Sequence, residues 1–453
     1  MRIAMVCDFF FPQAGGIEIH ILQIAKQLIS RGHHVIVITH AYGDRSGVRY
    51  MSHGLKVYYV PFLVIYREST IPTLFTFFPL FRQIMLRERI EIVHGHASMS
   101  ALCHECIVHA RTMGLATVFT DHSLFEFSNL PSILVNKVMK FVMTDVDHVI
   151  GVSHTSRENT VLRAALDPAK TSAIPNAVVS EEFEPRKSGE KLTALTSLGI
   201  PPAKDSEITL VVCSRLYANK GADLLVSVIP QVCAAEPNLR VLIAGNGPKI
   251  VDLQQMCEQR SLQDRVHLVG AIRHDQVRDF MVCGEIYLHS ALTEAFGTVI
   301  VEAASCGLLV VTTNVGGIPE VLPDHMTVYA DPAAKQLTQA TLRAVNMVRK
   351  REIEPKKFHT EIKQMYHWQD VAVRTEKVYE RVKKNSMGST ETLMDRIQRH
   401  YQCGFWAGKV FVLSIVADTL LLFVLNWLKP ASQIDIAPDW SAHDPSLKKK
   451  TLT

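Results

Sequence analysis

The stretch 294-EAFGTVIVE-302 decides how the second half of this chain folds. It follows an apolar run that ends at His289, and a helical pattern begins within it. A strand that leads through a glycine into a helix is half of a βαβ unit, in which parallel strands alternate with covering helices. Gly297, Thr298 and Val299 fall at the start of this helix, where free backbone amides can hold phosphate groups.

Two carboxylates bracket this segment, and both suit a ligand with hydroxyl groups. Glu302 lies about one turn into the helix, where it can accept hydrogen bonds from both hydroxyls of a ribose. Glu294 lies outside the helix and is free to contact the hydroxyls of a sugar, and Phe296 stands beside it. The alternative is a capping carboxylate plus one surface glutamate. We interpret the segment as a nucleotide-sugar site.

Two cations follow the first strand of the same half, which is expected at residues 208–213. Arg215 and Lys220 share one loop, and Gly221 comes directly after them. Two cations on one loop can clamp a diphosphate and neutralise the charge that develops on it as it leaves. A solvated basic pair is the alternative. We predict that Arg215, Lys220 and Glu294 are catalytic.

Two glycine pairs lie in loops that follow strands. Gly15 and Gly16 come after the strand that ends near Asp8, and paired glycines let backbone amides approach a diphosphate. Gly245 and Gly247 resemble part of the dinucleotide fingerprint, but the proline that follows them removes an amide donor. The strict fingerprint is missing, so a nicotinamide cofactor is not expected. We assign all four glycines to donor binding.

Strands and helices alternate twice along the chain, which predicts two doubly wound, Rossmann-like domains. The first run has strands expected at about residues 2–8, 34–40, 55–61, 90–95, 116–120, 147–152 and 171–175. The second has strands expected at about 208–213, 239–244, 266–269, 285–289, 308–312 and 326–329. The predicted parts are an N-terminal domain (1–190), a C-terminal domain with closing helices (191–385), a linker (386–408), a transmembrane helix (409–429) and a polar tail (430–453).

The predicted transmembrane helix rests on the apolar run from Val410 to Leu428, flanked by Trp406 and Trp427. At 1.5 Å per residue such a run is about 28 Å long, close to the thickness of a hydrocarbon core. Asp418 in its middle is costly in lipid, so it is predicted to face a partner subunit. A buried amphipathic helix is the alternative.

A second apolar stretch, 72-PTLFTFFPLFRQIM-85, is unusually aromatic. It is too short to span a bilayer but could lie at its surface, with rings inserted and cations near headgroups. Phe77, Phe78 and Arg82 are therefore candidates for membrane contact. A core helix of the first domain is the alternative.

The composition excludes several classes of protein. The chain has 48 basic and 44 acidic residues, so no nucleic-acid partner is expected. Its nine cysteines lie mostly in apolar patterns, which indicates buried thiols in a reducing compartment. Cys103 and Cys106 form one CxxC without a second ligand pair at suitable spacing, so no structural zinc site is predicted.

One histidine and one acidic motif remain. His122 follows the strand expected at about 116–120, where it could position a donor or an acceptor or polarise a leaving oxygen. A structural histidine is the alternative. Asp145-Val146-Asp147 matches the DxD that binds a metal–diphosphate in some sugar transferases, but it leads directly into a strand. We predict no metal and no cofactor.

These motifs together resemble the retaining glycosyltransferases of the GT-B fold, the family that includes sucrose synthase and bacterial phosphatidylinositol mannosyltransferases. The hallmarks are Gly15-Gly16, Arg215 with Lys220, and the pair of glutamates Glu294 and Glu302. The resemblance covers about residues 1–385. It implies two Rossmann-like domains that face a cleft and catalysis without a covalent nucleophile of the kind found in glycosidases.

Longer runs are similar to the catalytic subunits of phosphatidylinositol N-acetylglucosaminyltransferase complexes. They include 117-TVFTDHSLFEF-127, 292-LTEAFGTVIVEAASCG-307 and 314-NVGGIPEVLP-323. This closer resemblance implies UDP-N-acetylglucosamine as donor, phosphatidylinositol as acceptor, and several membrane subunits as partners. It also implies the cytosolic face of the endoplasmic reticulum. Transfer of another sugar, such as mannose, to a lipid and a non-catalytic donor-binding scaffold remain alternatives.

Overall fold

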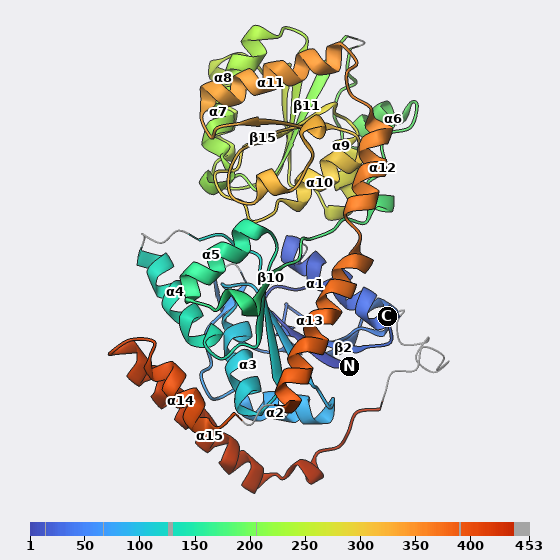
Figure 1. The fold of residues 1–453 in the computed structure, drawn as a ribbon. Coiled ribbons are helices and arrows are strands. Elements are labelled where there is room, and N and C mark those ends of the chain that lie inside the picture. The colour runs from blue at the N-terminus through green and yellow to red at the C-terminus, as the bar shows by residue number, and fades with distance from the viewer. Residues whose placement is uncertain (14, 67, 126–129, 205, 389–390, 439–453) are drawn as a thin grey trace. The chain divides into compact units, whose positions relative to one another are not determined.

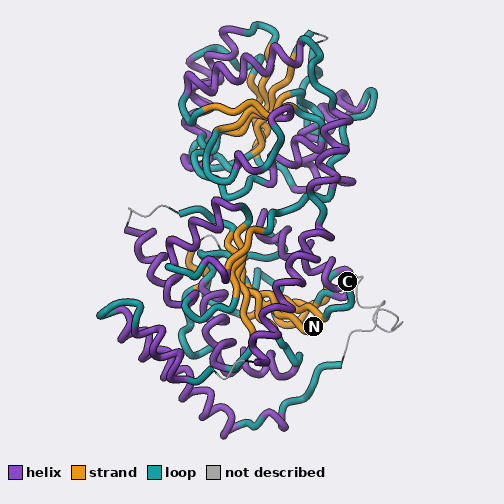
Figure 2. Tube along the Cα trace, in the orientation of Figure 1, coloured by secondary structure: helices purple, strands orange, loops and turns teal. Residues whose placement is uncertain are grey.

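The chain forms two compact units, each built on its own sheet (Figures 1 and 2). This computed structural model describes residues 1–13, 15–66, 68–125, 130–204, 206–388 and 391–438. The N-terminal unit comprises residues 1–175 and 369–453, and the C-terminal unit comprises residues 176–368. Each unit is a mixed α/β layer structure, as the alternation of strands and helices predicts.

The N-terminal sheet has the strand order β10-β9-β8-β7-β1-β2-β4-β3, parallel except for β3. Its strands are β1 (Arg2–Val6), β2 (His34–His40), β3 (Gly47–Tyr50), β4 (Lys56–Val60), β7 (Ile92–His96), β8 (Ala116–Asp121), β9 (His148–Gly151) and β10 (Thr171–Ala173). A separate hairpin joins β5 (Val64–Tyr66) to β6 (Ser69–Thr70). The helices are α1 (Gly16–Ser30), α2 (Phe78–Arg87), α3 (Ala101–Thr112), α4 (Leu130–Met143), α5 (His154–Ala164), α13 (Trp368–Gly388), α14 (Leu393–Tyr401) and α15 (Ala407–Leu428).

The C-terminal sheet is parallel throughout, in the order β13-β12-β11-β14-β15-β16. Its strands are β11 (Ile208–Cys213), β12 (Leu239–Ala244), β13 (Val266–Gly270), β14 (Ile286–His289), β15 (Leu309–Thr313) and β16 (Thr327–Ala330). Its helices are α6 (Glu190–Ser197), α7 (Ala222–Ala235), α8 (Ile250–Gln259), α9 (Val277–Met281), α10 (Thr298–Ser305), α11 (Ala334–Arg349) and α12 (Pro355–Met365).

Each sheet has one point where the strand order reverses. In the N-terminal sheet the point lies between β1 and β7, and in the C-terminal sheet it lies between β11 and β14. At such a point the loops beyond the carboxyl ends of two neighbouring strands diverge and leave room for a ligand. The topology therefore places one candidate binding edge on each unit.

The boundaries of the domains differ from the predicted ones. The units divide at residue 175 rather than 190, and the chain returns to the N-terminal unit from Gln369 onward. Helix α13 makes this return, because its Tyr379 hydroxyl lies 2.6 Å from His94 Nδ1 and its Arg374 donates to the carbonyl of Ala173. The predicted linker, 386–408, was wrong in part, since α13 extends to Gly388 and α14 occupies Leu393–Tyr401.

The aromatic part of the stretch 72–85 packs into the core, although Leu74 and Leu80 are exposed. Phe77, Phe78 and Arg82 are each at most 4% exposed, so the prediction for these three residues was wrong. Helix α2 packs the two rings into the hydrophobic cluster under the sheet. Aromatic density in the sequence fits a buried helix as well as an interfacial one, and the structure shows the former.

Helix α15 has the length and composition of a membrane span, with a mean hydropathy of 2.1 over its best window. It begins at Ala407 and ends at Leu428, within two residues of the predicted bounds. Asp418, however, faces its own chain. Its Oδ1 lies 2.7 Å from His109 Nδ1 on α3, so the expectation that it faces a partner subunit is corrected.

Candidate binding site of the C-terminal unit and histidine cluster of the N-terminal unit

Lys220 and Glu294 meet at the reversal point of the C-terminal sheet. Lys220 follows β11 and Glu294 follows β14, the two strands that flank this point. Lys220 Nζ donates a hydrogen bond to Glu294 Oε2 at 2.5 Å. The structure thus brings together two residues that are 74 positions apart in the sequence and that were predicted to act together.

Gly221 allows the two loops to touch. It has φ +72, and a Cβ atom built on it would lie 1.7 Å from the carbonyl oxygen of Ser290, so no larger residue fits. The Ser290 hydroxyl donates to the carbonyl of Lys220, and the Leu292 amide donates to the carbonyl of Asn219. These bonds fix the backbone on both sides of the Lys220–Glu294 pair.

The electrostatics of the pair favour its charged form. Burial raises the pKa of Glu294, but hydrogen bonding to His289 and the charge of Lys220 outweigh it, so the pKa falls to about 2. The Nε2 atom of His289 lies 3.8 Å from the same carboxylate oxygen. Glu294 is therefore ionised at neutral pH and holds the ammonium group of Lys220 in place.

Helix α10 begins at Thr298, four residues beyond Glu294. Gly297 is its N-cap, in a left-handed conformation at φ +82, and no side chain caps the helix. The amides of the first turn, at Thr298 and Val299, thus lie where the sequence predicts a phosphate site. Phe296 is 3% exposed, and its ring packs edge-on against Tyr366 with the ring centroids 5.7 Å apart. Its side chain thus anchors the loop to the interior of the unit.

Glu302 lies one turn into α10 and has unusual surroundings. It is buried, and within the described ranges no side chain donates a hydrogen bond to its carboxyl group. Burial, with a smaller contribution from Glu182, raises the pKa of Glu302 to about 7. A buried carboxyl with spare acceptor capacity suits a ligand that brings its own donors, such as paired hydroxyl groups.

The remaining residues predicted for donor binding lie around the β11 loop. The side chain of Arg215 is exposed and makes no ion pair with any described residue. The backbone at Gly245 and Gly247 passes close to this loop, because the Leu216 amide donates to the carbonyl of Asn246. A Cβ atom at either glycine would lie within 2.3 Å of a carbonyl oxygen of the loop.

On the N-terminal unit, the glycine pair caps a helix as expected. Gly15 is the N-cap of α1 in extended conformation, without a side-chain cap, and Gly16 opens the helix. A Cβ atom on Gly15 would lie 2.6 Å from a carboxylate oxygen of Glu18. The first turn of α1 thus follows β1 at the reversal point of its sheet.

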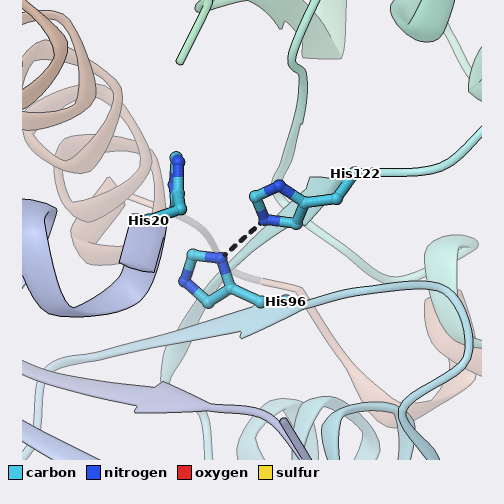
Figure 3. Close-up of side chains that lie close together, drawn as sticks. All are labelled: His20, His96 and His122. Carbon is cyan, nitrogen blue, oxygen red and sulfur yellow. Dashed lines mark hydrogen bonds between the residues drawn. The ribbon is translucent and has the colours of Figure 1, made fainter. Parts of the chain in front are cut away.

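Three histidines gather at the same edge (Figure 3). His20 comes from α1, His96 ends β7 and His122 follows β8, and the facing ring nitrogens lie within 4.8 Å of one another. His96 Nδ1 and His122 Nε2 are 3.3 Å apart, and the rings of His20 and His122 meet edge to face at 4.6 Å. Three imidazoles in this arrangement have the donor set of a transition-metal site.

His96 and His122 are neutral at physiological pH. Burial, and then the neighbouring imidazoles, lower the pKa of His122 and of His96 well below the usual value. Behind them, His94 is bound on both ring nitrogens, to Tyr379 at 2.6 Å and to Thr120 at 2.7 Å. His96, which contacts His122, and His94 behind it are therefore both neutral.

The residue before His122 anchors this edge. Asp121 Oδ2 accepts from Thr160 at 2.9 Å and from Arg163 at 3.1 Å, and both charged side chains are fully buried. Its Oδ1 accepts from the Ser98 hydroxyl at 2.7 Å. The ion pair fixes the end of β8 and the backbone that carries His122.

The acidic motif after α4 is occupied by structural partners. Asp145 pairs with Arg396 and Arg399 of α14, and Asp147 pairs with Arg111 of α3. Both carboxylates are thereby committed to ion pairs within the N-terminal unit. Cys103 and Cys106 are buried free thiols, as predicted.

Sequence reasoning missed His20, His96 and His289. Each lies at a strand end or one turn into the following helix, so a search for polar residues at these positions would have found them. It also missed Asp121, which directly precedes His122. The sequence signal for His96 and His289 lies in the runs 92-IVHGH-96 and 286-IYLH-289, because each run is a strand that ends in a histidine.

Two family models match the chain. Residues 40–129 match the family described as PIGA (GPI anchor biosynthesis), and residues 198–363 match glycosyl transferases group 1. The first match covers strands β3 to β8 and His122, and the second covers the Lys220–Glu294 site.

Several curated proteins are similar over nearly the whole chain. The phosphatidylinositol N-acetylglucosaminyltransferase gpi3 subunit of Schizosaccharomyces pombe is 56% identical over 96% of this chain and 92% of its own length. A phosphatidylinositol N-acetylglucosaminyltransferase subunit of Homo sapiens is 47% identical over 97% of this chain and 87% of its own length.

Solved structures of glycosyltransferases share the fold. Sucrose-phosphate synthase of Thermosynechococcus elongatus aligns with a TM-score of 0.70 at 21% identity, over 84% of this chain and 98% of that one. HepE of Anabaena in complex with UDP aligns with a TM-score of 0.67 at 18% identity, over 84% of this chain and all of that one. These likenesses confirm the GT-B fold.

Proposed function

The chain belongs to the family of phosphatidylinositol N-acetylglucosaminyltransferase catalytic subunits, and on that premise we propose how its residues serve the transfer. The family resemblance predicted from the sequence is confirmed. The chain is a glycosyltransferase that transfers N-acetylglucosamine to phosphatidylinositol, the first step of GPI-anchor biosynthesis.

The donor we propose is UDP-N-acetylglucosamine, held by the C-terminal unit. The observation that carries this proposal is the ionised Lys220–Glu294 pair beside the uncapped start of α10. The amides at Gly297 to Val299 would hold the phosphates, and Glu302 would accept from the ribose hydroxyls. The donor is bound without a metal ion in this proposal, and Lys220 and Arg215 supply the positive charge.

In the reaction, an inositol hydroxyl attacks the anomeric carbon of the sugar. The bond between that carbon and the β-phosphate oxygen breaks, and negative charge develops on the departing UDP. Lys220 and Arg215 would stabilise this charge. His122, neutral and rigidly held, would position the donor or the acceptor, and the hydroxyl proton leaves with the phosphate oxygen.

The setting we propose is the cytosolic face of the endoplasmic reticulum membrane, where α15 attaches the chain. The named relatives are subunits of a larger enzyme, and one helix of this chain is long and apolar enough to cross a membrane. The acceptor is a lipid, so attachment brings the catalytic units to their substrate. Membrane subunits of the same complex are the proposed partners.

The proposal is tested by incubating membranes that contain the chain with labelled UDP-N-acetylglucosamine and, in parallel, labelled UDP-hexoses, each with and without EDTA. We expect label in a phosphatidylinositol lipid only from UDP-N-acetylglucosamine, and equally with EDTA present. Label only from a hexose donor would contradict the donor assignment. Loss of transfer in EDTA would contradict metal-free binding of the donor. His20, His96 and His122 would then be the candidate metal ligands.

The buried carboxyl of Glu302 predicts a pH dependence of nucleotide binding. A pKa of about 7 means that Glu302 is largely protonated at pH 6 and largely ionised at pH 8. Because ribose hydroxyls donate to the ionised form, UDP affinity should be lower at pH 6 by on the order of tenfold. Titration calorimetry at both pH values checks this.

The matched variant is Glu302→Gln, which keeps the shape of the side chain and cannot ionise. Its UDP affinity should change less between the two pH values than that of the unaltered chain. Equal changes in both proteins would assign the pH dependence to the phosphate of UDP and contradict the role given to Glu302.

A further inference from the structure

Helix α15 is mostly apolar, and one side of it is packed against its own N-terminal unit (Figure 1). The opposite side forms an exposed stripe of large apolar residues. We name this set the outer stripe, and its residues are Val410, Leu413, Leu420, Phe423, Val424 and Trp427. A helix on the surface of a water-soluble domain presents polar residues outward, so this stripe needs another environment than water.

The inner side of α15 carries an acid that pairs with a histidine of the unit. Asp418 is 0% exposed, and its Oδ1 lies 2.7 Å from His109 Nδ1. The other ring nitrogen of His109 lies 3.5 Å from Glu105 on the same helix, α3. Burial alone would lower the pKa of His109, but Asp418 and Glu105 outweigh it and raise the pKa, which favours the charged imidazole.

The contacts continue outward from this ion pair into the fold. Glu105 accepts hydrogen bonds from the backbone and the hydroxyl of Thr73, which leads into α2. Phe78 of α2 stacks on the His109 ring at 4.1 Å with an interplanar angle of 2°. A chain of direct contacts thus joins the centre of α15 to two helices of the catalytic fold.

Both ends of α15 are attached to the same unit. Asn426 accepts a hydrogen bond from Arg82 Nε at 3.0 Å, and Leu422 and Leu425 pack on the hydrophobic cluster that contains α2. Near the start of the helix, Phe411 lies 4.7 Å from Phe141 of α4. Asp418 in the middle of α15 and Asn426 near its end thus both bond to the unit, on the side away from the outer stripe.

We infer that α15 stays packed on α2 and α3 at the membrane and presents its outer stripe to lipid acyl chains. The helix then holds the catalytic unit in a fixed position at the lipid surface. A helix without contacts to the unit would instead connect it to the membrane through a flexible linker. This deepens the proposed membrane-directed function and rests on it for the presence of lipid. Trp427 in the stripe, and Lys409 and Lys429 at the two ends of the helix, match the groups that favour the headgroup region.

The experiment places a photo-crosslinking residue at Leu422 or at Leu420 in the full chain, expressed with its complex in microsomes. The two positions lie on opposite sides of α15, because Leu422 packs on the cluster and Leu420 is 62% exposed. Leu422 should yield adducts within the chain, to peptides of α2 or α3, and Leu420 should yield adducts with lipid. Lipid adducts at both positions would overturn the inference, as would adducts of Leu420 with another protein of the complex.

A second arm tests the ion pair itself. In the Leu422 probe background, Asp418→Ala should remove most of the adduct within the chain, and Thr419→Ala should not. Thr419 is the matched control, because its hydroxyl donates to the carbonyl of Ile415 in its own helix. An adduct unchanged in Asp418→Ala would show that the pair does not hold the helix. Neither readout depends on sugar transfer, so failure of the proposed activity is detected separately.

Discussion

Replacing Lys220 with alanine is expected to lower kcat by about 10²–10³-fold, the usual loss when one preorganised group that stabilises developing charge is removed. Lys220 is the cation best placed for this role, because Glu294 fixes its ammonium group at 2.5 Å and both loops are hydrogen-bonded to each other. Besides the charge of the bound diphosphate, it would neutralise the additional charge that develops as UDP departs. The loss should therefore fall mainly on kcat and less on donor affinity.

The measurement is turnover in membranes at saturating donor, with UDP binding determined on the same variant. Lys350→Ala serves as the control, because Lys350 is exposed at the end of α11 and pairs weakly with Glu352 at 3.9 Å. It should retain full turnover. Near-normal turnover in Lys220→Ala would show that the leaving group is stabilised elsewhere. Arg215→Ala tests the second cation in the same assay and is expected to show a smaller loss, because its side chain is exposed.

Replacing Arg163 with leucine is expected to destabilise the N-terminal unit by about 3–5 kcal/mol. Arg163 and Asp121 form an ion pair in which neither side chain is exposed. Removal of the arginine leaves the Asp121 carboxylate buried without its countercharge, although the hydroxyls of Ser98 and Thr160 remain bound to it. Because Asp121 precedes His122, the edge that carries the histidines should loosen as well.

Chemical denaturation of the purified chain measures this loss. Lys137→Leu on the exposed side of α4 is the control and should change stability by no more than about 0.5 kcal/mol. The double variant Arg163→Leu with Asp121→Asn should recover part of the loss, because the amide carries no charge to leave unpaired. If Arg163→Leu unfolds at the same denaturant concentration as the unaltered chain, the buried pair contributes no net stability.

The C-terminal half of the candidate site could be predicted because its signals are local. Arg215 and Lys220 lie within a few residues of one strand, and Glu294 and Glu302 lie within one strand–helix connection. Strands such as Ile208–Cys213 are continuous apolar runs of the kind buried in parallel sheets, so they were found at the correct positions. Lys220 and Glu294 are in contact because β11 and β14 are neighbours in the sheet. The spacing of residues in the sequence does not predict that these two strands are neighbours.

The features that escaped prediction depend on tertiary contacts. The hairpin β5–β6 and the edge strand β3 are too short for a periodic signal. His20, His96 and His122 come from three separate segments and meet only through the order of the strands. Asp418 was predicted to face a partner subunit, because the sequence shows an acid among apolar residues. The sequence does not show that a histidine on α3 lies next to this acid in the fold.

The return of α13 to the first sheet makes the order of synthesis differ from the order of folding. Residues 1–175 leave the ribosome first, but the groups that complete their unit are Arg374, which binds the Ala173 carbonyl, and Tyr379, which binds His94. The whole C-terminal unit is translated in the interval. The nascent N-terminal unit therefore lacks its contacts with α13 while nearly two hundred residues are made, a period in which exposed apolar surface invites aggregation and chaperone binding. A stop codon anywhere before α13 would therefore damage the half of the protein that had already been made.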